Sequence, residues 1–309
     1  MSLQIFENAL NEYSAEKEKR KFFIRADYPM KRVTSFRIGG NADLAVYPAD
    51  TEAFIFGINA ARNLGVPYIV IGNGSNTLAS DKGFRGCVFV TTDMRKVTID
   101  GEYLTAGCGC LLGSVGTNAS TSGLSGAEFA NGIPGTVGGA VYMNAGAYGG
   151  QMSDIIQSTE CYDIDSGEVL TLDNTAQNFG YRHSIFMEKN YIVLSATFKL
   201  TRGNPDEIKA KMNEYLRARR DKQPLEFPSA GSVFKRPEGH FAGKLIEDAG
   251  LKGTSVGGAM VSPKHAGFIV NTGDATASDV FALIEIIKEK VYSMFGVMLE
   301  CEIRFVGEK

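Results

Sequence analysis

The sequence predicts an α+β protein of more than one domain, and three observations support this class. Residues 42–71 show a βαβ-like pattern, residues 86–200 carry mainly antiparallel strand signals, and residues 202–309 mix helical and strand patterns. A chain of 309 residues is long enough for two domains with a large core. We expect the main domain boundary at residues 202–205 and a division of the preceding part near residue 92.

The first segment begins with a helix and continues into the βαβ-like pattern. An exposed amphipathic helix is expected over residues 4–21, within an N-terminal extension of residues 1–30. Asp50 then caps a helix over residues 51–64, because an aspartate oxygen accepts hydrogen bonds from the N–H groups of the first turn. Short strands flank that helix over residues 42–47 and 68–71.

The middle segment is predicted to hold antiparallel strands and one helix. Asp100-Gly101 and residues 165–167 each mark a hairpin, since aspartate and glycine favour tight turns. A short helix is expected over residues 111–122, and a strand over residues 191–200.

The last segment is predicted to hold two long helices and a final strand. Pro205 opens a helix that reaches about residue 220, and a strongly amphipathic helix covers residues 277–295. Residues 298–306 alternate apolar and polar side chains, which is the pattern of a half-buried strand.

Composition and charge exclude several classes of function. A net charge of −3 gives no basic surface, so we expect neither nucleic acid nor a membrane as partner. No apolar run is long enough to span a bilayer. Five scattered cysteines indicate reduced thiols in a cytoplasmic protein, and with only three histidines no metal site is predicted. We expect a monomer.

The most informative stretch is glycine-rich and runs from Gly123 to Gly150. So many glycines let the main chain approach a ligand closely, and Pro134 prevents one helix from running through the whole stretch. The composition is not that of a disordered linker. A cofactor site is therefore indicated, and tight turns among close-packed strands are the alternative.

A second glycine loop, Gly72-Asn73-Gly74-Ser75-Asn76, follows the predicted strand 68–71. Successive N–H groups in such a turn form a donor cluster that suits phosphate oxygens. No Gly-Lys-Ser/Thr follows, which excludes a Walker loop, and the next residues indicate a turn, which excludes the dinucleotide-binding fingerprint. An ordinary connection from strand to turn is the alternative.

Six blocks of sequence stand in a recognisable order: Thr34 to Gly40, Val70 to Asn76, Gly132 to Gly149, Tyr181 to Ser184, Gly231 to Lys235, and Glu302 to Phe305. Together they resemble the UDP-N-acetylenolpyruvoylglucosamine reductase family over about residues 30–307. The resemblance implies an FAD-binding domain of two α+β subdomains over residues 31–201, of the type shared with vanillyl-alcohol oxidase and p-cresol methylhydroxylase. A substrate-binding domain over residues 202–309 follows. The short segment between Arg182 and Ser232 is similar to the shorter, second type of the family.

The family chemistry implied by this resemblance uses non-covalent FAD, with NADPH as reductant. The substrate is UDP-N-acetylglucosamine enolpyruvate, and the product is UDP-N-acetylmuramate, a peptidoglycan precursor. Reduction of the enolpyruvyl group creates an enolate-like charge beside a carboxylate. That charge needs a cation or a proton donor aimed at it.

Three residues are expected to be catalytic by this resemblance. Arg182 would grip the carboxylate, because a guanidinium binds it bidentately and stays charged. Ser232 would donate the proton, and Glu302 would stabilise the intermediate through a hydrogen bond. If Glu302 is protonated at neutral pH, burial must raise its pKa. The ordinary alternatives are a surface ion pair for Arg182, a turn-bonded serine for Ser232 and a solvated strand face for Glu302.

The resemblance also implies binding residues. The expected FAD contacts are Gly72, Asn73, Gly74, Ser75 and Asn76 on the pyrophosphate, with Gly132, Ile133, Gly138 and Gly139 toward the flavin. Lys222 and Arg236 are the candidates for the substrate diphosphate, although such basic runs usually form a solvated helix end.

Two other functions stay open at this point. A flavin oxidase of the same fold would use oxygen, but the blocks around Ser232 and Glu302 lie outside the FAD domain and favour the reductase. A non-catalytic protein that binds FAD or a UDP-sugar would not need Arg182, Ser232 and Glu302 together. The sequence does not distinguish NADPH from NADH.

Overall fold

The structure of the protein is a computed structural model that describes residues 2–308. Its residues form two compact units. The first unit comprises the chain up to Ile24, Val46–Asn73 and Val88–Arg219. The second comprises Arg25–Ala45, Gly74–Cys87 and the chain from Arg220 onward. Each unit combines several separate stretches of the chain, whereas the sequence predicted three consecutive segments. The boundaries of those segments stay a prediction.

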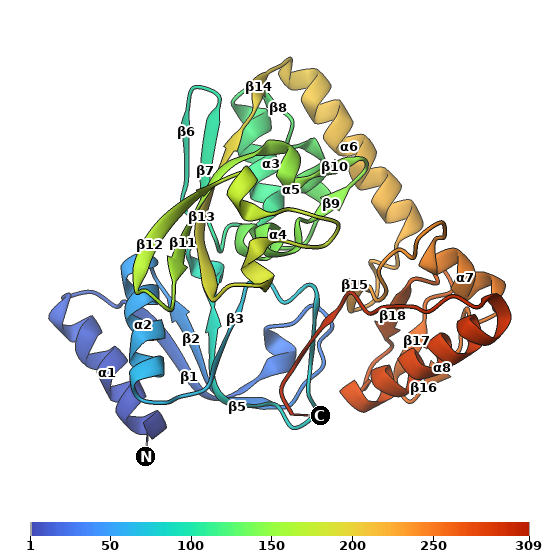
Figure 1. Ribbon diagram of the computed structural model, residues 1–309, viewed down its shortest axis with the longest axis horizontal. Coiled ribbons are helices and arrows are strands. Elements are labelled where there is room, and N and C mark those ends of the chain that lie inside the picture. Colours follow the sequence, from blue (N-terminus) through green and yellow to red (C-terminus); the bar gives the residue numbers. More distant parts are fainter. Residues whose placement is uncertain (1, 309) are drawn as a thin grey trace. The chain divides into compact units, whose positions relative to one another are not determined.

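The largest sheet of the first unit has five antiparallel strands in the order β12-β11-β13-β7-β6 (Figure 1). Its strands are β6 (Val97–Asp100), β7 (Tyr103–Gly107), β11 (Ile156–Asp163), β12 (Glu168–Asp173) and β13 (Tyr191–Lys199). Hairpins join β6 to β7 and β11 to β12 at the two predicted turns. The helix α3 (Leu112–Thr121) is also confirmed.

The middle of the first unit contains short elements within the glycine-rich stretch. After the 3₁₀ helix η3 (Glu128–Gly132), the chain forms α4 (Val137–Met143) and α5 (Met152–Ile155). Two pairs of two-residue strands complete this region: β8 (Leu124–Ser125) with β14 (Thr201–Arg202), and β9 (Gly146–Ala147) with β10 (Gly150–Gln151). Pro134 indeed separates η3 from α4.

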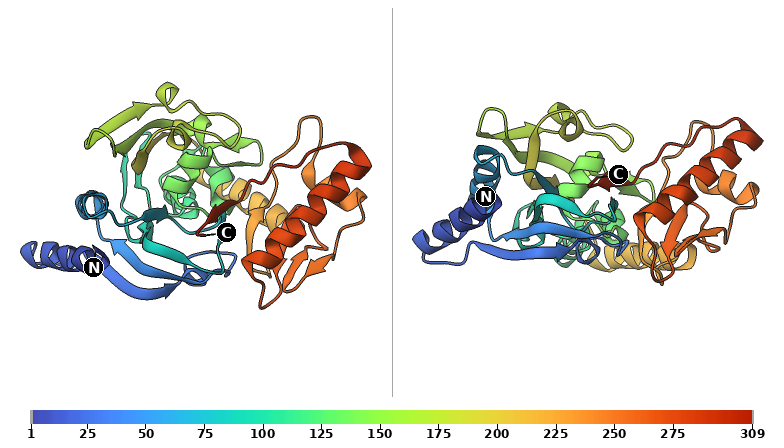
Figure 2. Two further views of the ribbon diagram at one scale, coloured as in Figure 1. Left: turned by 60° about the horizontal axis from the view of Figure 1, so that its bottom comes forward. Right: turned by 90° about the horizontal axis from the view of Figure 1, so that it is seen from below.

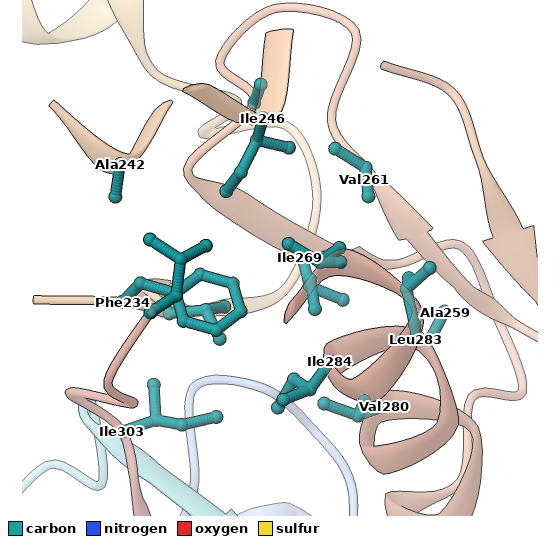
Figure 3. Close-up of a cluster of buried hydrophobic side chains, with 14 of the residues drawn as sticks. Phe234, Ala242, Ile246, Ala259, Val261, Ile269, Val280, Leu283, Ile284 and Ile303 are labelled. Atoms are coloured by element: carbon teal, nitrogen blue, oxygen red, sulfur yellow. The ribbon is translucent and has the colours of Figure 1, made fainter. Parts of the chain in front are cut away.

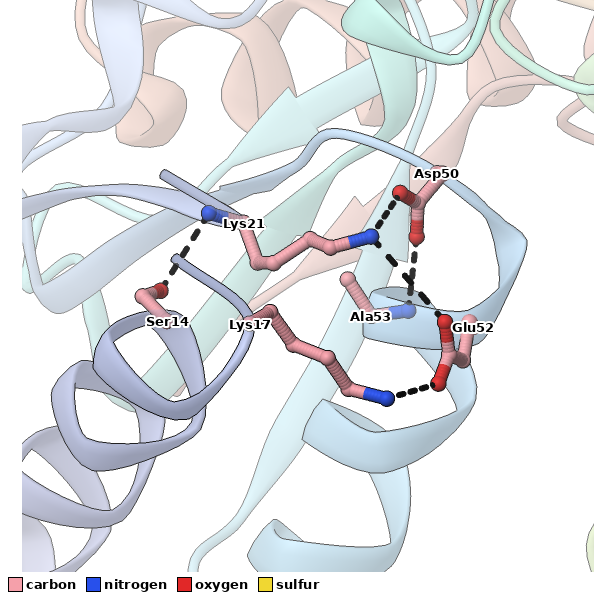
Figure 4. A network of polar contacts seen from close by, with 6 residues as sticks. All are labelled: Ser14, Lys17, Lys21, Asp50, Glu52 and Ala53. Atoms are coloured by element: carbon pink, nitrogen blue, oxygen red, sulfur yellow. Dashed lines mark hydrogen bonds and ion pairs between the residues drawn. The ribbon is translucent and has the colours of Figure 1, made fainter. Parts of the chain in front are cut away.

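The helices α1 (Ser2–Glu16) and α2 (Thr51–Asn63) pack together in the first unit. Tyr13 of α1 stacks on Phe56 of α2 with ring centroids 4.0 Å apart. Two ion pairs also connect the residues after α1 to the start of α2: Lys17 pairs with Glu52 and Lys21 with Asp50, both at 2.6 Å (Figure 4). The predicted helix 4–21 therefore ends earlier, at Glu16, because the lysines that follow turn toward the start of α2.

A four-stranded sheet has the order β1-β2-β5-β3. Its strands are β1 (Phe22–Pro29), β2 (Asn41–Pro48), β3 (Tyr68–Ile71) and β5 (Phe84–Val90). The strands β2 and β3 and the Asp50 cap of α2, whose Oδ1 accepts from Ala53 N at 2.9 Å, confirm the βαβ-like pattern. β1 was not predicted.

The second unit is built on the antiparallel sheet β15-β18-β17-β16. Its elements are β15 (Ser229–Ser232), β16 (Ser255–Val256), β17 (Ala259–Val261), β18 (Phe268–Asn271), α7 (Ala242–Asp248) and α8 (Ala277–Phe295). In Figure 2 the long helix α8 lies against this sheet, and it contacts β16 and β17. The long helix α6 (Pro205–Lys222) has its last residues in this unit.

The core of the second unit joins α8 to the sheet. Val280, Leu283 and Ile284 of α8 are at most 2% exposed and face Ala259 and Ile269 (Figure 3). The helix begins at a capping box between Thr276 and Asp279 and ends at Gly296, which has the left-handed φ of +68°. The prediction for this helix is confirmed.

The final strand is shorter than predicted. Only β19 (Arg304–Val306) forms a strand, and it runs parallel to β4 (Thr77–Ala79). The preceding residues pair instead with the chain after β15, where Phe234 bridges Cys301. The expected alternation of burial is still present, since Leu299 and Ile303 are buried while Glu300 and Arg304 are exposed.

Candidate active site

The first half of the glycine loop is fixed against the glycine-rich stretch. Asn73 donates from Nδ2 to the carbonyl oxygen of Pro134, 2.7 Å away. A Cβ atom on Gly72 would overlap Oγ1 of Thr136, so this position accepts only glycine without rearrangement. Gly72 and Asn73 therefore lie beside the predicted block Gly132 to Gly139.

Thr136 places a buried hydroxyl group beside Gly72. Its side chain is 1% exposed, and Oγ1 has no hydrogen-bond partner within residues 2–308. The residue is the N-cap of α4, yet its hydroxyl makes no capping hydrogen bond. Leaving such a hydroxyl unpaired costs about 1–3 kcal/mol. A polar ligand group beside Gly72 would satisfy it.

A pocket of about 520 Å³ lies in the first unit and includes two of the predicted cofactor residues, Asn73 and Ile133. Its remaining lining residues are Leu111, Gly113, Ser114, Thr117, Asn118, Asn131 and Pro134. The lining combines apolar side chains with hydroxyl and amide groups. Such a lining suits a large organic ligand that carries a few hydrogen-bonding groups.

The other predicted glycines differ in their surroundings. Gly138 donates to the carbonyl of Cys108 at 2.8 Å, and its small size allows Cys108 to pack against it. Gly139 is exposed, and a Cβ atom added at this position would lie 3.7 Å from Oγ1 of Thr136. Burial raises the pKa of Cys108 to about 12, so this thiol is an unreactive packing group.

Gly132 lies against Arg219, whose Cδ would be 3.4 Å from a Cβ at this glycine. Burial lowers the pKa of the Arg219 guanidinium. This arginine ends the part of α6 that belongs to the first unit. Lys222, one of the two residues predicted for the substrate diphosphate, follows on the same helix and belongs to the second unit.

Arg182 lies on a tight turn of the first unit. Gly180 and His183 exchange two main-chain hydrogen bonds, of 3.1 and 3.2 Å, across Tyr181 and Arg182. Arg182 has a left-handed φ of +53°, which costs a residue with a side chain about 1–2 kcal/mol. Strained conformations of this kind are found at functional sites, where the surrounding structure imposes them.

The guanidinium of Arg182 is half-buried. Its Nη2 donates to the carbonyl of Gly146 at 3.5 Å, and the group lies 5.3 Å from the centre of the Tyr181 ring. The hydrogen bond to Gly146 joins Arg182 to the glycine-rich stretch, and its catalytic role stays a prediction.

The second half of the glycine loop belongs to the second unit. Gly74 has a left-handed φ of +57°, and its carbonyl accepts a hydrogen bond of 3.2 Å from the N–H of Ser35. Ser75 is half-buried, and its carbonyl oxygen is the nearest atom to the Cβ position of Gly231, at 3.9 Å. Asn76 donates from Nδ2 to the carbonyl of Glu302 at 3.1 Å.

Ser232 ends β15, directly after Gly231, which has a φ of +78°. The ladder between β15 and β18 shifts register between Ser229 and Ser232, which places Ser232 opposite Phe268. The Ser232 hydroxyl is half-buried and donates to the carbonyl of Phe234 at 3.2 Å. Ser232 therefore makes a hydrogen bond within its own turn, which is the ordinary alternative to a catalytic role for this serine.

Glu302 lies on the segment next to Ser232. Its main-chain N–H donates to the carbonyl of Val233 at 2.7 Å, and its side chain is half-buried. The neighbouring Glu300 points elsewhere and pairs with Lys235 at 3.0 Å. The second unit thus brings together Ser232, Glu302 and Asn76, whereas Arg182 belongs to the first unit.

The two residues predicted for the substrate diphosphate lie in different settings. Lys222 is exposed at the end of α6. Arg236 donates from Nε to the carbonyl of His240 at 3.3 Å, and its guanidinium lies 4.0 Å from the centre of the Phe241 ring. Both assignments stay predictions.

Two further residues of the region were missed in the sequence. Thr136 lies inside the block Gly132 to Gly139, but the sequence alone does not indicate whether the hydroxyl of a single threonine has a hydrogen-bond partner. Asn144 caps the end of α4 with a left-handed φ of +42° and is 2% exposed. An asparagine that directly follows a short helix could have indicated this conformation.

The described part of the chain shows no group of three or more histidine, cysteine or acidic residues arranged to hold a metal ion. Over the same residues, 2–308, every helix is too short or too polar to cross a membrane.

Comparison with known proteins gives matches over both parts of the chain. Residues 42–173 match the family model of an FAD binding domain, and residues 223–306 match that of the UDP-N-acetylenolpyruvoylglucosamine reductase C-terminal domain. The mixed helix and strand fold therefore combines an FAD-binding domain with this C-terminal domain.

Similar proteins match almost the whole chain. The UDP-N-acetylenolpyruvoylglucosamine reductase of Caldanaerobacter subterraneus subsp. tengcongensis is 51% identical over 91% of this chain and 93% of its own. The protein of the same name from Clostridium novyi is 48% identical over 93% of each. The crystal structure of the reductase from Thermus caldophilus has a TM-score of 0.78 at 35% identity and covers 92% of this chain and 99% of its own. With such identity over both matched domains, this chain belongs to the UDP-N-acetylenolpyruvoylglucosamine reductase family.

Proposed function

We propose that this protein reduces UDP-N-acetylglucosamine enolpyruvate to UDP-N-acetylmuramate, with FAD as cofactor and NADPH as reductant. The observation that supports this most strongly is the 51% identity with a named reductase over 91% of the chain. An oxidase of the same fold or a non-catalytic binding protein is not favoured, because the match includes the reductase C-terminal domain.

The residues of the first unit suit FAD. The matched FAD-binding domain, residues 42–173, contains Gly72 and the unpaired hydroxyl of Thr136. Polar atoms of the cofactor would satisfy that hydroxyl, and the pocket that includes Asn73 and Ile133 offers both apolar and polar walls. The contacts predicted at Gly132, Gly138 and Gly139 are part of the same proposal. Those predicted at Gly74, Ser75 and Asn76, which belong to the second unit, stay predictions. When bound, FAD supplies the hydride chemistry that links NADPH to the enolpyruvyl group.

Arg182 binds the carboxylate of the enolpyruvyl group in this proposal. Hydride addition to the double bond, before protonation, would spread negative charge onto that carboxylate, and a fixed guanidinium stabilises the charge where it develops. The strained turn supports this role, because it fixes the main chain of Arg182 and so the direction in which its Cα–Cβ bond points.

Ser232 donates the proton that completes the lactyl ether. A serine hydroxyl is a weak acid, so it protonates only a strongly basic carbon, such as that of an enolate. Its hydroxyl donates to the Phe234 carbonyl, and rotation about the Cβ–Oγ bond would direct the O–H toward the substrate instead. Glu302, on the neighbouring segment, stabilises the same intermediate through a hydrogen bond.

Lys222 and Arg236 are proposed to bind the diphosphate of the UDP group. Their cationic side chains supply the charge that this group requires. The product is a peptidoglycan precursor, so we place the protein in cell-wall synthesis in the cytoplasm, acting as a monomer and contributing through this pathway to cell shape and division.

The proposal is tested by product analysis. Purified protein with FAD, NADPH and UDP-N-acetylglucosamine enolpyruvate should consume NADPH and form a product two hydrogens heavier than the substrate, identified by mass spectrometry. UDP-N-acetylglucosamine, which lacks the enolpyruvyl group, is the matched control and should cause no consumption. NADPH consumption that depends on oxygen alone and yields no reduced sugar would support the oxidase.

A further inference from the structure

Asn144 connects three segments of the first unit. It follows α4, and its side chain is almost completely buried, at 2% exposure. Its Oδ1 accepts from the N–H of Ser153 at 2.9 Å, and its Nδ2 donates to the carbonyl of Gly180, also at 2.9 Å. This one side chain therefore joins three places: the C-terminal end of α4, the beginning of α5 and the turn that carries Arg182.

The Gly180 carbonyl is the key acceptor of that turn. It accepts from the N–H of His183 across the turn and from Nδ2 of Asn144 outside it. The turn alone leaves Arg182 in a left-handed conformation that few residues with side chains adopt. The second hydrogen bond comes from a buried amide, so it fixes the turn relative to α4.

A second buried contact holds the other end of the turn. The Ser184 hydroxyl is 0% exposed and donates to the carbonyl of Tyr142 at 2.7 Å. Tyr142 belongs to α4, as does the residue that precedes Asn144. The turn carrying Arg182 is thus bonded on both sides to one short helix, and both bonds use side chains that are buried.

We propose that Asn144 is a positioning residue for Arg182: its hydrogen bond to Gly180 sets the direction in which the guanidinium is presented. The inference rests on the proposed function, in which Arg182 binds the substrate carboxylate. Asn144 itself is buried, and within residues 2–308 its side chain hydrogen-bonds to main-chain groups and to Gln151, so its effect on the reaction passes through the turn.

Asn144→Asp tests the inference with a small change. Aspartate keeps the oxygen that accepts from Ser153 and tolerates the left-handed conformation. It lacks the amide donor and sets a carboxylate oxygen against the Gly180 carbonyl. Asn144→Gly is a second variant, which removes all three side-chain hydrogen bonds without adding charge or strain. Asn174→Asp is the matched control, because Asn174 donates to the carbonyls of Ser153 and Ile156 and not to the turn.

The measurements use the FAD-loaded protein. In both Asn144 variants, flavin reduction by NADPH should stay within about twofold of the unchanged protein, while reoxidation by the enolpyruvyl substrate should slow by about ten- to a hundredfold. Asn144→Asp combined with Arg182→Ala should be no slower than Arg182→Ala alone, because the two changes remove the same interaction. Amide hydrogen exchange at His183 should accelerate in the Asn144 variants and not in Asn174→Asp.

The outcomes separate two kinds of failure. If Arg182→Ala reoxidises as fast as the unchanged protein, the proposed role of Arg182 is wrong and the positioning role falls with it. If Arg182→Ala is slow but Asn144→Asp is as fast as Asn174→Asp, or if the two changes add fully in the double variant, the positioning inference alone is overturned. Unchanged exchange at His183 in both Asn144 variants would also contradict it.

Discussion

Nδ2 of Asn76 donates a hydrogen bond to the main-chain carbonyl of Glu302, 3.1 Å away. A second hydrogen bond joins the same two segments, because the N–H of Arg304 donates to the main-chain carbonyl of Asn76 at 2.8 Å. A residue of the glycine loop therefore fixes the segment that carries a predicted catalytic carboxyl group. Two positions separated by more than two hundred residues in the sequence become direct neighbours, and both belong to blocks that first indicated the family.

Replacing Glu302 by glutamine should slow reduction of the substrate by about tenfold or more, because an amide is a weaker proton donor and cannot ionise. Flavin reduction by NADPH should be unaffected. Stopped-flow absorbance of the two half-reactions measures this difference. Glu300→Gln is the control: Glu300 is an exposed partner of Lys235, and its replacement should change neither rate by more than about twofold. Equal slowing in both variants would remove the specific role of Glu302.

Replacing Ser232 by alanine should slow the same half-reaction by about a hundredfold, because the proposed proton donor is absent. The protein should remain folded, since the lost hydrogen bond, to Phe234, lies within a half-buried turn. Ser255→Ala, at an exposed serine of the same sheet, is the control. A Ser232→Ala variant in which both half-reactions slow equally would show that Ser232 is not the specific proton donor.

Gly72→Ala should lower both stability and FAD retention. The added methyl group overlaps the Thr136 side chain, and overpacking of this kind costs about 1–3 kcal/mol. Thermal unfolding and the flavin absorbance of the purified variant measure the two effects. Thr136→Ala in the same chain should recover part of the stability, because it removes the overlapping hydroxyl.

Gly273→Ala is the matched control for this change, because no atom lies within 4 Å of a Cβ at Gly273 and its φ is not left-handed. A melting temperature of Gly72→Ala equal to that of Gly273→Ala would contradict the close approach of Gly72 to Thr136.

The pair of Lys21 and Asp50 should make the docking of α1 sensitive to pH (Figure 4). Burial acts to raise the pKa of Asp50, but hydrogen bonds from Lys21 and from the N–H of Ala53 outweigh it and lower that pKa. The hydrogen bond to Asp50 also raises the pKa of Lys21. The stabilisation is therefore complete between the ordinary pKa values of the two groups, 3.8 and 10.5, and is lost below and above this range.

Asp50→Asn separates charge from capping, since asparagine also caps helices well. At neutral pH the variant should be less stable by up to about 1 kcal/mol, and the difference should shrink at about pH 3, because below 3.8 the unfolded chain takes up a proton that the lowered pKa of Asp50 keeps off the folded protein. Thermal unfolding at both pH values measures this. A difference that does not change with pH would show that the charge of Asp50 contributes nothing.

Sequence patterns predicted the long periodic elements well. The helix α8, with its capping box at Thr276, and the hairpin of β11 and β12 required only local information, which is present in residue spacing. The final strand was predicted too long because alternation of Leu299 to Phe305 reports burial on one face, not the partner. The main chain before Arg304 pairs with the segment around Phe234, more than sixty residues earlier, and no local pattern encodes that choice.

The site was predictable only in part for the same reason. The resemblance named Ser232, Glu302 and Asn76, and the structure brings their main chains together. Thr136 and Asn144 were missed. Thr136 is notable for a buried hydroxyl without a hydrogen-bond partner, and Asn144 for a buried amide that hydrogen-bonds to both Gly180 and Ser153. Such properties arise from contacts that are distant in sequence and have no signature in the chain itself.

The most direct test of the whole account is an anaerobic visible absorption spectrum of the purified, FAD-loaded protein, recorded after NADPH and then after UDP-N-acetylglucosamine enolpyruvate. The account predicts that the flavin absorbance bleaches with NADPH and returns when the enolpyruvyl sugar is added. Absorbance that returns only when oxygen is admitted, or a protein that takes up no FAD, would contradict it.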